Sequence, residues 1–192
     1  MIGGTRFIVF ASERTQQTAS LRCIKIVMDW RPTRQSPWPV RKSPIHLPVR
    51  EGFDRQVIIF VTTCTHTRKP ILCEKDIHQE ILRAWRKADT WLVGRYVVMP
   101  DHIHLFCTPA SNNFPELRKW IQYWKALASC AWPRMDEQPV WQKSFWDTEL
   151  RGGESYERKW EYMRQNPVRK GLVATAEDWP FQGEMNKLDW FG

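Results

Sequence analysis

The sequence lacks an apolar segment long enough to cross a lipid bilayer. The longest apolar run near its middle covers residues 57–61, far short of the roughly 18 residues that a membrane-spanning helix needs. Near the N-terminus, residues 8–11 are too few for the apolar region of a secretory signal, and the charged Glu13 and Arg14 follow directly. These absences exclude a transmembrane enzyme, and we expect a cytoplasmic protein without a membrane partner.

Several metal-binding and phosphate-binding patterns are also missing. The 192 residues include five cysteines, which are scattered and form no C-x-x-C pair. This pattern indicates neither a disulfide framework nor a zinc ribbon. The chain has no H-E-x-x-H sequence, so a zinc hydrolase lacks its usual ligand spacing. It also has no G-x-x-x-x-G-K-[ST] loop, which argues against an ATP-dependent enzyme.

Positive charge and tryptophan are what the sequence has in excess. With 29 Lys and Arg against 21 Asp and Glu, its formal net charge is +8, and it contains 12 tryptophans. A hydrophobic fraction of 42% is enough for a packed core, and the length suits one domain with an arm. Cationic and flat aromatic side chains together suit a polyanion with stackable bases, so nucleic acid is the leading partner class.

Residues 31–50 differ in composition from the rest of the chain. They contain five prolines, five Lys or Arg residues and no acidic residue. Because proline at this density prevents a helix or a central strand, we expect an extended arm that contacts DNA phosphates through cations such as Arg31, Arg34, Arg41 and Lys42. Met28 directly precedes the arm, and we expect translation to begin there. The predicted division is an N-terminal extension (1–28), the arm (29–51), a folded domain (52–182) and a tail (183–192).

From residue 52 onward, the hydrophobic pattern predicts an α+β fold. A β-branched run at 57–64 indicates a buried strand, and the apolar runs 91–99 and 102–108, joined by Pro100-Asp101, indicate a hairpin. Helical spacing of apolar residues predicts helices at 74–89, at about 113–132 and at 154–166. Asn113 and Glu116 resemble a capping box at the start of the second helix, and Pro167 ends the third. This order predicts helices packed on a mainly antiparallel sheet.

The second strand of the hairpin carries His102 and His104. Alternate residues on a strand share a face, with Cα atoms roughly 6.5 to 7 Å apart, so both imidazoles can reach one cation. Two unrelated polar positions on a half-exposed strand would give the same pattern. The chain has only five histidines, however, and Pro100-Asp101 places this pair at the entry of a hairpin, which favours a metal site.

The last predicted helix carries an outward tyrosine. Tyr156, Trp160 and Met163 form its apolar stripe, and Tyr162 lies about 200° around the helix from Trp160. An ordinary exposed tyrosine on an amphipathic helix would have the same spacing. The residues one turn away from Tyr162 form a polar and basic face suited to phosphate: Arg158, Lys159, Gln165 and Asn166. The carboxamide oxygen of Asn166 can complete a site begun by the two histidines, a donor set that suits Mg²⁺ or Mn²⁺.

Several segments, in this order, resemble the REP-associated tyrosine transposases, a branch of the single-tyrosine HUH transposases. They are VTTCTHTRKPIL, VMPDHIHLF, WQKSFWDTELR, EYMRQNPVRKGLV and EDWPF, all within residues 52–182. The segment Phe145-Trp146-Asp147-Thr148 departs from many relatives, which have histidine there. The resemblance implies a ferredoxin-like or RRM-like antiparallel sheet with helices packed on one face.

The resemblance also implies an activity and the residues that perform it. Members of this family are metal-dependent DNA endonucleases and strand transferases that cut and rejoin single-stranded or hairpin DNA through a 5′-phosphotyrosine intermediate. It implies Tyr162 as the nucleophile, and His102, His104 and Asn166 as ligands of a divalent metal. A phenol with a pKa of about 10 is a poor nucleophile at neutral pH, so a cation at the scissile phosphate is consistent with this chemistry. Both a monomer and a homodimer are compatible with the sequence.

Two other interpretations use the same residues. Rolling-circle initiators and relaxases share the histidine pair and the tyrosine, but they commonly have a lysine three residues after the nucleophile, where this chain has Gln165. A non-catalytic nucleic-acid binder would use the arm together with Trp120, Trp124 and Trp141 to grip and stack bases without cutting.

Overall fold

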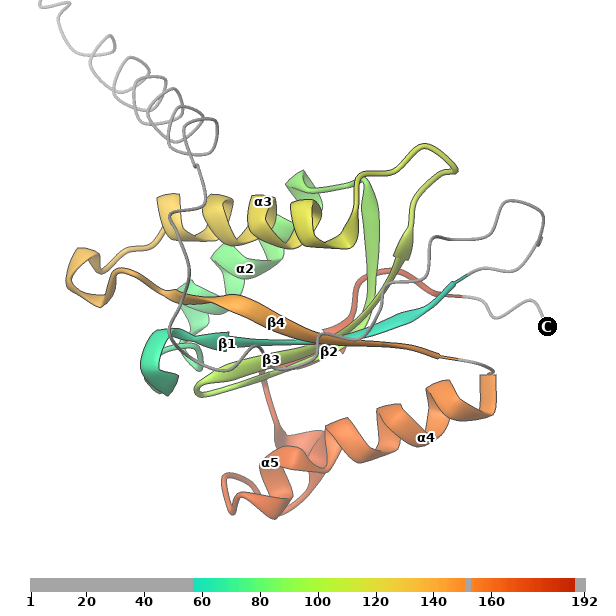
Figure 1. Ribbon diagram of the computed structural model, residues 1–192. Coiled ribbons are helices and arrows are strands. Elements are labelled where there is room, and N and C mark those ends of the chain that lie inside the picture. The colour runs from blue at the N-terminus through green and yellow to red at the C-terminus, as the bar shows by residue number, and fades with distance from the viewer. Residues whose placement is uncertain (1–56, 151–152, 189–192) are drawn as a thin grey trace, which may run out of the picture. The chain divides into compact units, whose positions relative to one another are not determined.

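The computed structural model describes residues 57–150 and 153–188 (Figure 1). The predicted N-terminal extension and the predicted arm lie outside the described residues, and so do the arm cations Arg31, Arg34, Arg41 and Lys42. Among the residues described, no helix combines the length and the apolar composition that a membrane span requires.

A five-stranded sheet forms the centre of the described region. Its strands are β1 (Ile59–Thr65), β2 (Trp91–Met99), β3 (His102–Pro109), β4 (Trp141–Glu149) and β5 (Gln182–Glu184). They lie in the order β4-β1-β3-β2-β5, and every neighbouring pair is antiparallel. Helices α2 (Lys75–Lys87) and α3 (Leu117–Cys130) connect β1 to β2 and β3 to β4. This is the β-α-β-β-α-β arrangement of ferredoxin-like folds, with β5 added at one edge. The predicted α+β class is therefore confirmed.

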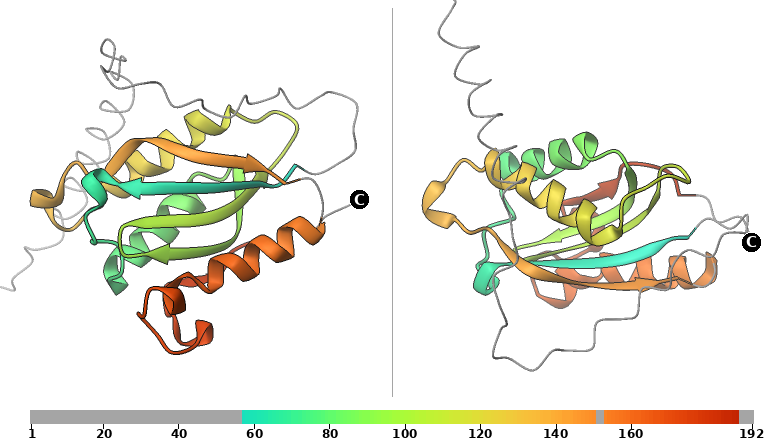
Figure 2. Two further views of the ribbon diagram at one scale, coloured as in Figure 1. Left: turned by 60° about the horizontal axis from the view of Figure 1, so that its bottom comes forward. Right: turned by 45° about the horizontal axis from the view of Figure 1, so that its top comes forward.

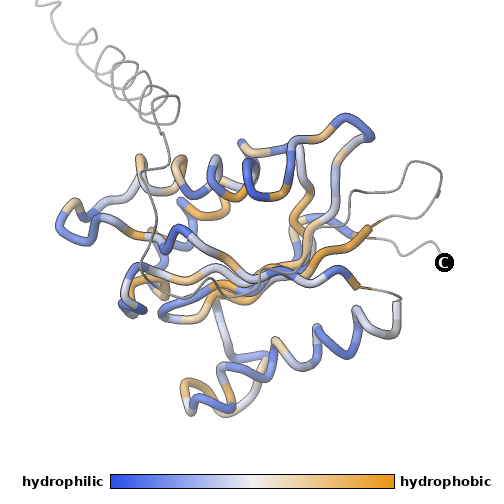
Figure 3. Tube along the Cα trace, viewed as in Figure 1, coloured by the Kyte–Doolittle hydropathy of each residue, from blue (hydrophilic) through white to orange (hydrophobic). Residues whose placement is uncertain are grey.

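Helices cover both faces of this sheet. Helices α2 and α3 lie on one face, and α4 (Gly153–Arg164) with the short α5 (Asn166–Arg169) lies on the other (Figures 1 and 2). The prediction of helices on one face of the sheet is thus correct for α2 and α3. Helix α4 forms an additional layer on the other face. The apolar colour follows the central strands, and α4 is largely hydrophilic on its outer side (Figure 3).

Strand alternation separates two hydrophobic cores. On β3, Ile103, Leu105 and Cys107 belong to the core under α2 and α3, while Phe106 belongs to the core under α4. Because side chains alternate between faces, His102 and His104 share the α4 face with Phe106. The sequence of β3 therefore presents its two imidazoles to the helix that carries Tyr162.

The structure contains two strands and one helix start that the sequence analysis did not predict. Strand β4 follows the loop with Pro133 and Pro139; as an edge strand it pairs only with β1 and buries few of its side chains, so its hydrophobic alternation is weak. Strand β5 has only three residues. Helix α3 begins at Leu117 rather than near Asn113, and its N-cap is Glu116 without a side-chain hydrogen bond. Pro115 explains this later start, since it disfavours a helical backbone at the preceding residue.

Candidate active site

The two histidines lie side by side where β3 begins. The β2–β3 turn at Pro100-Asp101 leads directly into His102, and the ring centroids of His102 and His104 are 4.7 Å apart at an interplanar angle of 83°. Both side chains are partly buried, and Ile103 between them is fully buried on the opposite face. The hairpin therefore brings the imidazoles together as the spacing predicts.

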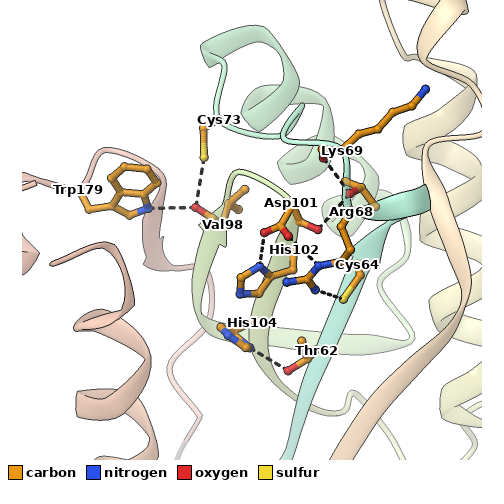
Figure 4. Close-up of polar contacts among 11 residues, drawn as sticks. Thr62, Cys64, Arg68, Lys69, Cys73, Val98, Asp101, His102, His104 and Trp179 are labelled. Atoms are coloured by element: carbon orange, nitrogen blue, oxygen red, sulfur yellow. Dashed lines mark hydrogen bonds and ion pairs between the residues drawn. The ribbon is translucent and has the colours of Figure 1, made fainter. Parts of the chain in front are cut away.

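Each imidazole is oriented by a hydrogen bond at Nδ1. His102 Nδ1 lies 2.6 Å from Oδ1 of Asp101, and His104 Nδ1 lies 2.8 Å from Oγ1 of Thr62 (Figure 4). Thr62 comes from β1, where the sheet register places it directly opposite His104. Histidines that bind metals almost always donate their second ring N–H in this way, to a carboxylate or another oxygen. With Nδ1 engaged in both rings, Nε2 is the ring atom that each histidine would offer to a metal.

The surroundings of both imidazoles favour their neutral form. Burial, together with the smaller effect of the charges of His102, Lys159, Arg68 and Arg169, lowers the pKa of His104 to about 3. Burial also lowers the pKa of His102, although the hydrogen bond and the charge of Asp101 oppose this effect. A neutral imidazole is the form that coordinates a cation, so the electrostatics of the site fit a metal-binding histidine pair.

Tyr162 lies on the outward side of α4. Its side chain is 57% exposed, while Tyr156 and Met163 on the same helix are buried against the sheet. This is the orientation that the apolar stripe predicts. Arg158 is exposed on the same helix, and Lys159 is half-buried.

An aromatic bridge joins α4 to the histidine pair. The Phe60 ring of β1 stacks on the His104 ring with centroids 5.4 Å apart, and Nζ of Lys159 lies 4.8 Å from the Phe60 centroid. Tyr162 follows Lys159 by three residues, which is one helical turn. The helix that carries Tyr162 therefore crosses the sheet beside the two imidazoles.

The side chain of Asn166 contacts Arg169. It begins α5, and its Oδ1 accepts a hydrogen bond from the guanidinium of Arg169. Within the part of the chain that the structure describes, no hydrogen bond joins Asn166 to either imidazole. The assignment of Asn166 as a metal ligand stays a prediction.

The donor set fits a divalent cation only in part. The two imidazoles supply nitrogen ligands with fixed orientation. Residues 57–150 and 153–188 contain no group of three or more His, Cys, Asp or Glu side chains arranged to hold a metal. Further ligands would therefore be oxygens of another kind, from a carboxamide, water or a substrate phosphate.

The residues that support the histidines were not predicted from the sequence. Asp101 lies within VMPDHIHLF, directly before His102. Thr62 and Arg68 lie within VTTCTHTRKPIL, and only the strand register and the β1–α2 loop bring these two to the site. The only signal in the sequence is the acidic residue directly before the H-x-H pattern.

The tryptophans proposed for base stacking are core residues. Trp120 and Trp124 are 1% and 0% exposed, and Trp141 is 8% exposed. Their rings pack against one another and against Trp85, Trp91 and Trp132. The prediction that these three side chains stack on bases is therefore wrong.

Comparison with known proteins points to one group. The chain is 27% identical over 107 residues to the REP-associated tyrosine transposase of Escherichia coli strain K12, a match that covers 52% of this chain and 62% of the relative. It is also 27% identical over 114 residues to a protein of Haemophilus influenzae named as a putative REP-associated tyrosine transposase, covering 50% and 64% of the two chains. The resemblance to REP-associated tyrosine transposases is confirmed. The matches span less than two thirds of the length of these relatives. No family model matches the chain.

The fold comparison agrees with the sequence comparison. A solved REP-associated tyrosine transposase bound to a REP hairpin superimposes with a TM-score of 0.54 at 22% identity, covering 71% of this chain and 81% of that one. At this identity the likeness concerns the fold, and it supports the ferredoxin-like assignment.

Proposed function

We propose that this chain is a transposase that binds hairpin DNA, and cuts and rejoins single-stranded DNA through a covalent bond to Tyr162. The observation that carries the proposal is the position of α4, which lies beside the oriented pair His102 and His104 and exposes Tyr162. The relatives named as REP-associated tyrosine transposases support it, as does a neighbour described with a REP hairpin.

The reaction is a transesterification, in which the DNA phosphate moves from a 3′ oxygen to the Tyr162 oxygen. The Tyr162 oxygen attacks the scissile phosphorus and loses its proton, the bond from phosphorus to the 3′ oxygen breaks, and that oxygen leaves as a hydroxyl. The DNA 5′ end is then held as a phosphotyrosine, and a 3′ hydroxyl can reverse the step at a new end. Since one ester replaces another, no nucleotide cofactor is needed.

His102 and His104, with Asn166 as a third ligand, would hold Mg²⁺ or Mn²⁺. Such a cation withdraws charge from a phosphate oxygen and stabilises a leaving oxygen. Lys159, Arg158 and the predicted arm supply positive charge for the DNA backbone.

The test is incubation of the full chain with single-stranded hairpin DNA from the flanks of its own gene, with Mg²⁺ or with EDTA, followed by a denaturing gel. We expect a metal-dependent covalent adduct with wild-type protein. Tyr162→Phe removes one outward oxygen, so it should fold and bind normally but form no adduct. Tyr123→Phe is the matched control, because Tyr123 is also exposed but lies on α3, against the opposite face of the sheet.

Three outcomes would contradict the assignment. An adduct mapped to another tyrosine, or formed by Tyr162→Phe, would refute Tyr162 as the nucleophile. Hairpin binding without any metal-dependent nicking would favour a non-catalytic binding protein.

A further inference from the structure

Arg169 makes three contacts with Tyr162 and Asn166, which lie near the junction of α4 and α5. Its guanidinium carbon lies 4.2 Å from the centroid of the Tyr162 ring. One guanidinium nitrogen, Nη2, donates a 2.6 Å hydrogen bond to the backbone carbonyl of Tyr162 and a second bond to Oδ1 of Asn166. One side chain thus contacts the ring of Tyr162, the backbone that carries that ring, and the carboxamide of Asn166.

The local sequence fixes the chain that presents Arg169. Pro167 near the start of α5 has a backbone already suited to the first helical turn. Four residues later Gly171 ends the turn with φ +66°, a conformation that favours glycine. The N–H of Gly171 donates to Val168 and that of Leu172 donates to Pro167, both at 2.9 Å, which is the hydrogen-bond pattern of a Schellman cap. The turn therefore directs Arg169 back toward the end of α4.

The exposed position of Tyr162 explains why such a contact matters. Its side chain is 57% exposed, and it lies in the last turn of α4, where backbone carbonyls have no partner within the helix. The Arg169 guanidinium pairs with its carbonyl and covers one face of its ring. Arg169 is also close enough to His104 for its charge to act on that imidazole.

We propose that Arg169 is a positioning residue for Tyr162 and Asn166. It holds the phenol and the carboxamide in one orientation relative to the histidine pair, so that the Tyr162 oxygen meets the scissile phosphate without a search among rotamers. The planar guanidinium is essential, since a lysine ammonium cannot stack on the ring and bond two oxygens in a fixed geometry. This role rests on the proposed covalent reaction at Tyr162.

The first experiment separates positioning from phosphate binding. Adduct formation is measured in single turnover at saturating hairpin DNA, and the dissociation constant of the DNA is measured separately, for wild type, Arg169→Lys and Arg169→Gln. We expect the saturated rate to fall about 10-fold or more in Arg169→Lys and about 100-fold in Arg169→Gln, as misplaced reacting groups do. The dissociation constant should change much less in Arg169→Lys, which keeps the charge. Lys119→Gln, an exposed charge change on α3, is the matched control and should keep the wild-type rate.

The second experiment needs neither DNA nor activity. NMR spectra of the free protein with isotope-labelled tyrosine give the Tyr162 ring signals, which are assigned by their loss in Tyr162→Phe. A guanidinium stacked on the ring shifts these signals, so both Arg169 variants should move them while the other tyrosines stay in place. Thermal unfolding of each variant checks that the fold is retained.

These outcomes distinguish the two claims. Wild-type rates in Arg169→Lys, a rate loss that higher DNA concentration fully restores, or unmoved Tyr162 signals in both variants would overturn the role of Arg169. Absence of any adduct in the wild-type protein would instead overturn the proposed function, while the NMR comparison would still test the contact.

Discussion

The Asp101 carboxylate accepts a 2.6 Å hydrogen bond from Nδ1 of His102. Its other oxygen pairs with Nε of Arg68, also at 2.6 Å, so the carboxylate is held from both sides. Arg68 reaches Asp101 from a loop in which Thr67 and Arg68 both have positive φ, 55° and 60°. Such conformations are costly for residues other than glycine and are concentrated at functional sites. This loop thus supports the carboxylate that orients His102.

Removing the charge of Asp101 tests this support. We expect Asp101→Asn to lower the affinity of the free protein for Mn²⁺ by about 10- to 100-fold, because losing the partner of a ligating histidine has this effect. Titration calorimetry or Mn²⁺ paramagnetic resonance measures it. Asp136→Asn makes the same chemical change in the exposed helical turn Met135–Glu137 and should bind as wild type. Equal affinity in both variants would refute the role of Asp101.

Loss of either imidazole should separate nicking from binding. We expect His102→Ala and His104→Ala to abolish nicking while most of the DNA affinity remains, because affinity depends on cationic contacts distributed over the surface. Denaturing gels and fluorescence anisotropy measure the two properties on the same samples. Asn166→Ala should reduce nicking less, since water can replace one neutral ligand. Equal nicking by wild type and both histidine variants would remove the metal-site assignment.

The predicted arm should contribute mainly to the salt dependence of binding. Deleting residues 29–50 removes five Lys or Arg residues. Each lost contact with a single-stranded phosphate should reduce the slope of log affinity against log salt by roughly 0.7. The measurement is a series of hairpin titrations at increasing salt. A slope equal to that of the full chain would mean that the arm acts only as a spacer.

A buried lysine gives the fold a pH dependence independent of the active site. Lys125 on α3 is 7% exposed and donates a 3.0 Å hydrogen bond to the carbonyl of Gln142 on the edge strand β4. Burial lowers its pKa from 10.5 to about 8. Between these values the unfolded chain binds more protons than the folded one, so the free energy of unfolding should rise with pH by up to about 1.4 kcal/mol per unit.

The Lys125→Met variant isolates this effect. Urea denaturation gives the unfolding free energy of both proteins below and across this pH window. The wild-type value minus the variant value should increase as the pH rises from about 8 to about 10.5, because only the wild type gains stability from this lysine. Lys119→Met changes an exposed lysine on the same helix and should show no such increase. A constant difference for Lys125→Met would mean that its ammonium is not destabilised by burial.

The amino-acid sequence by itself determined the elements with strong periodicity. Strand β2 has the predicted limits, Trp91–Met99, and α2 lies within the predicted helix 74–89. The apolar stripe of α4 correctly predicted that Tyr162 points outward, and the two-residue spacing correctly placed His102 and His104 on one face. These are properties of residues a few positions apart, which local geometry controls.

Only the tertiary structure decided which distant residues complete the site. Thr62 reaches His104 through the register of β1 and β3, 42 residues apart in the chain, and Lys159 approaches the same site because α4 crosses the face opposite α2 and α3. The weakly alternating β4 likewise becomes a strand because β1 offers it a free edge. Arg169 lies within local range of Tyr162, but its contact depends on a turn ended by Gly171. Pairing across a sheet and packing of a layer depend on surfaces that form only when the chain folds, so no local pattern encodes them.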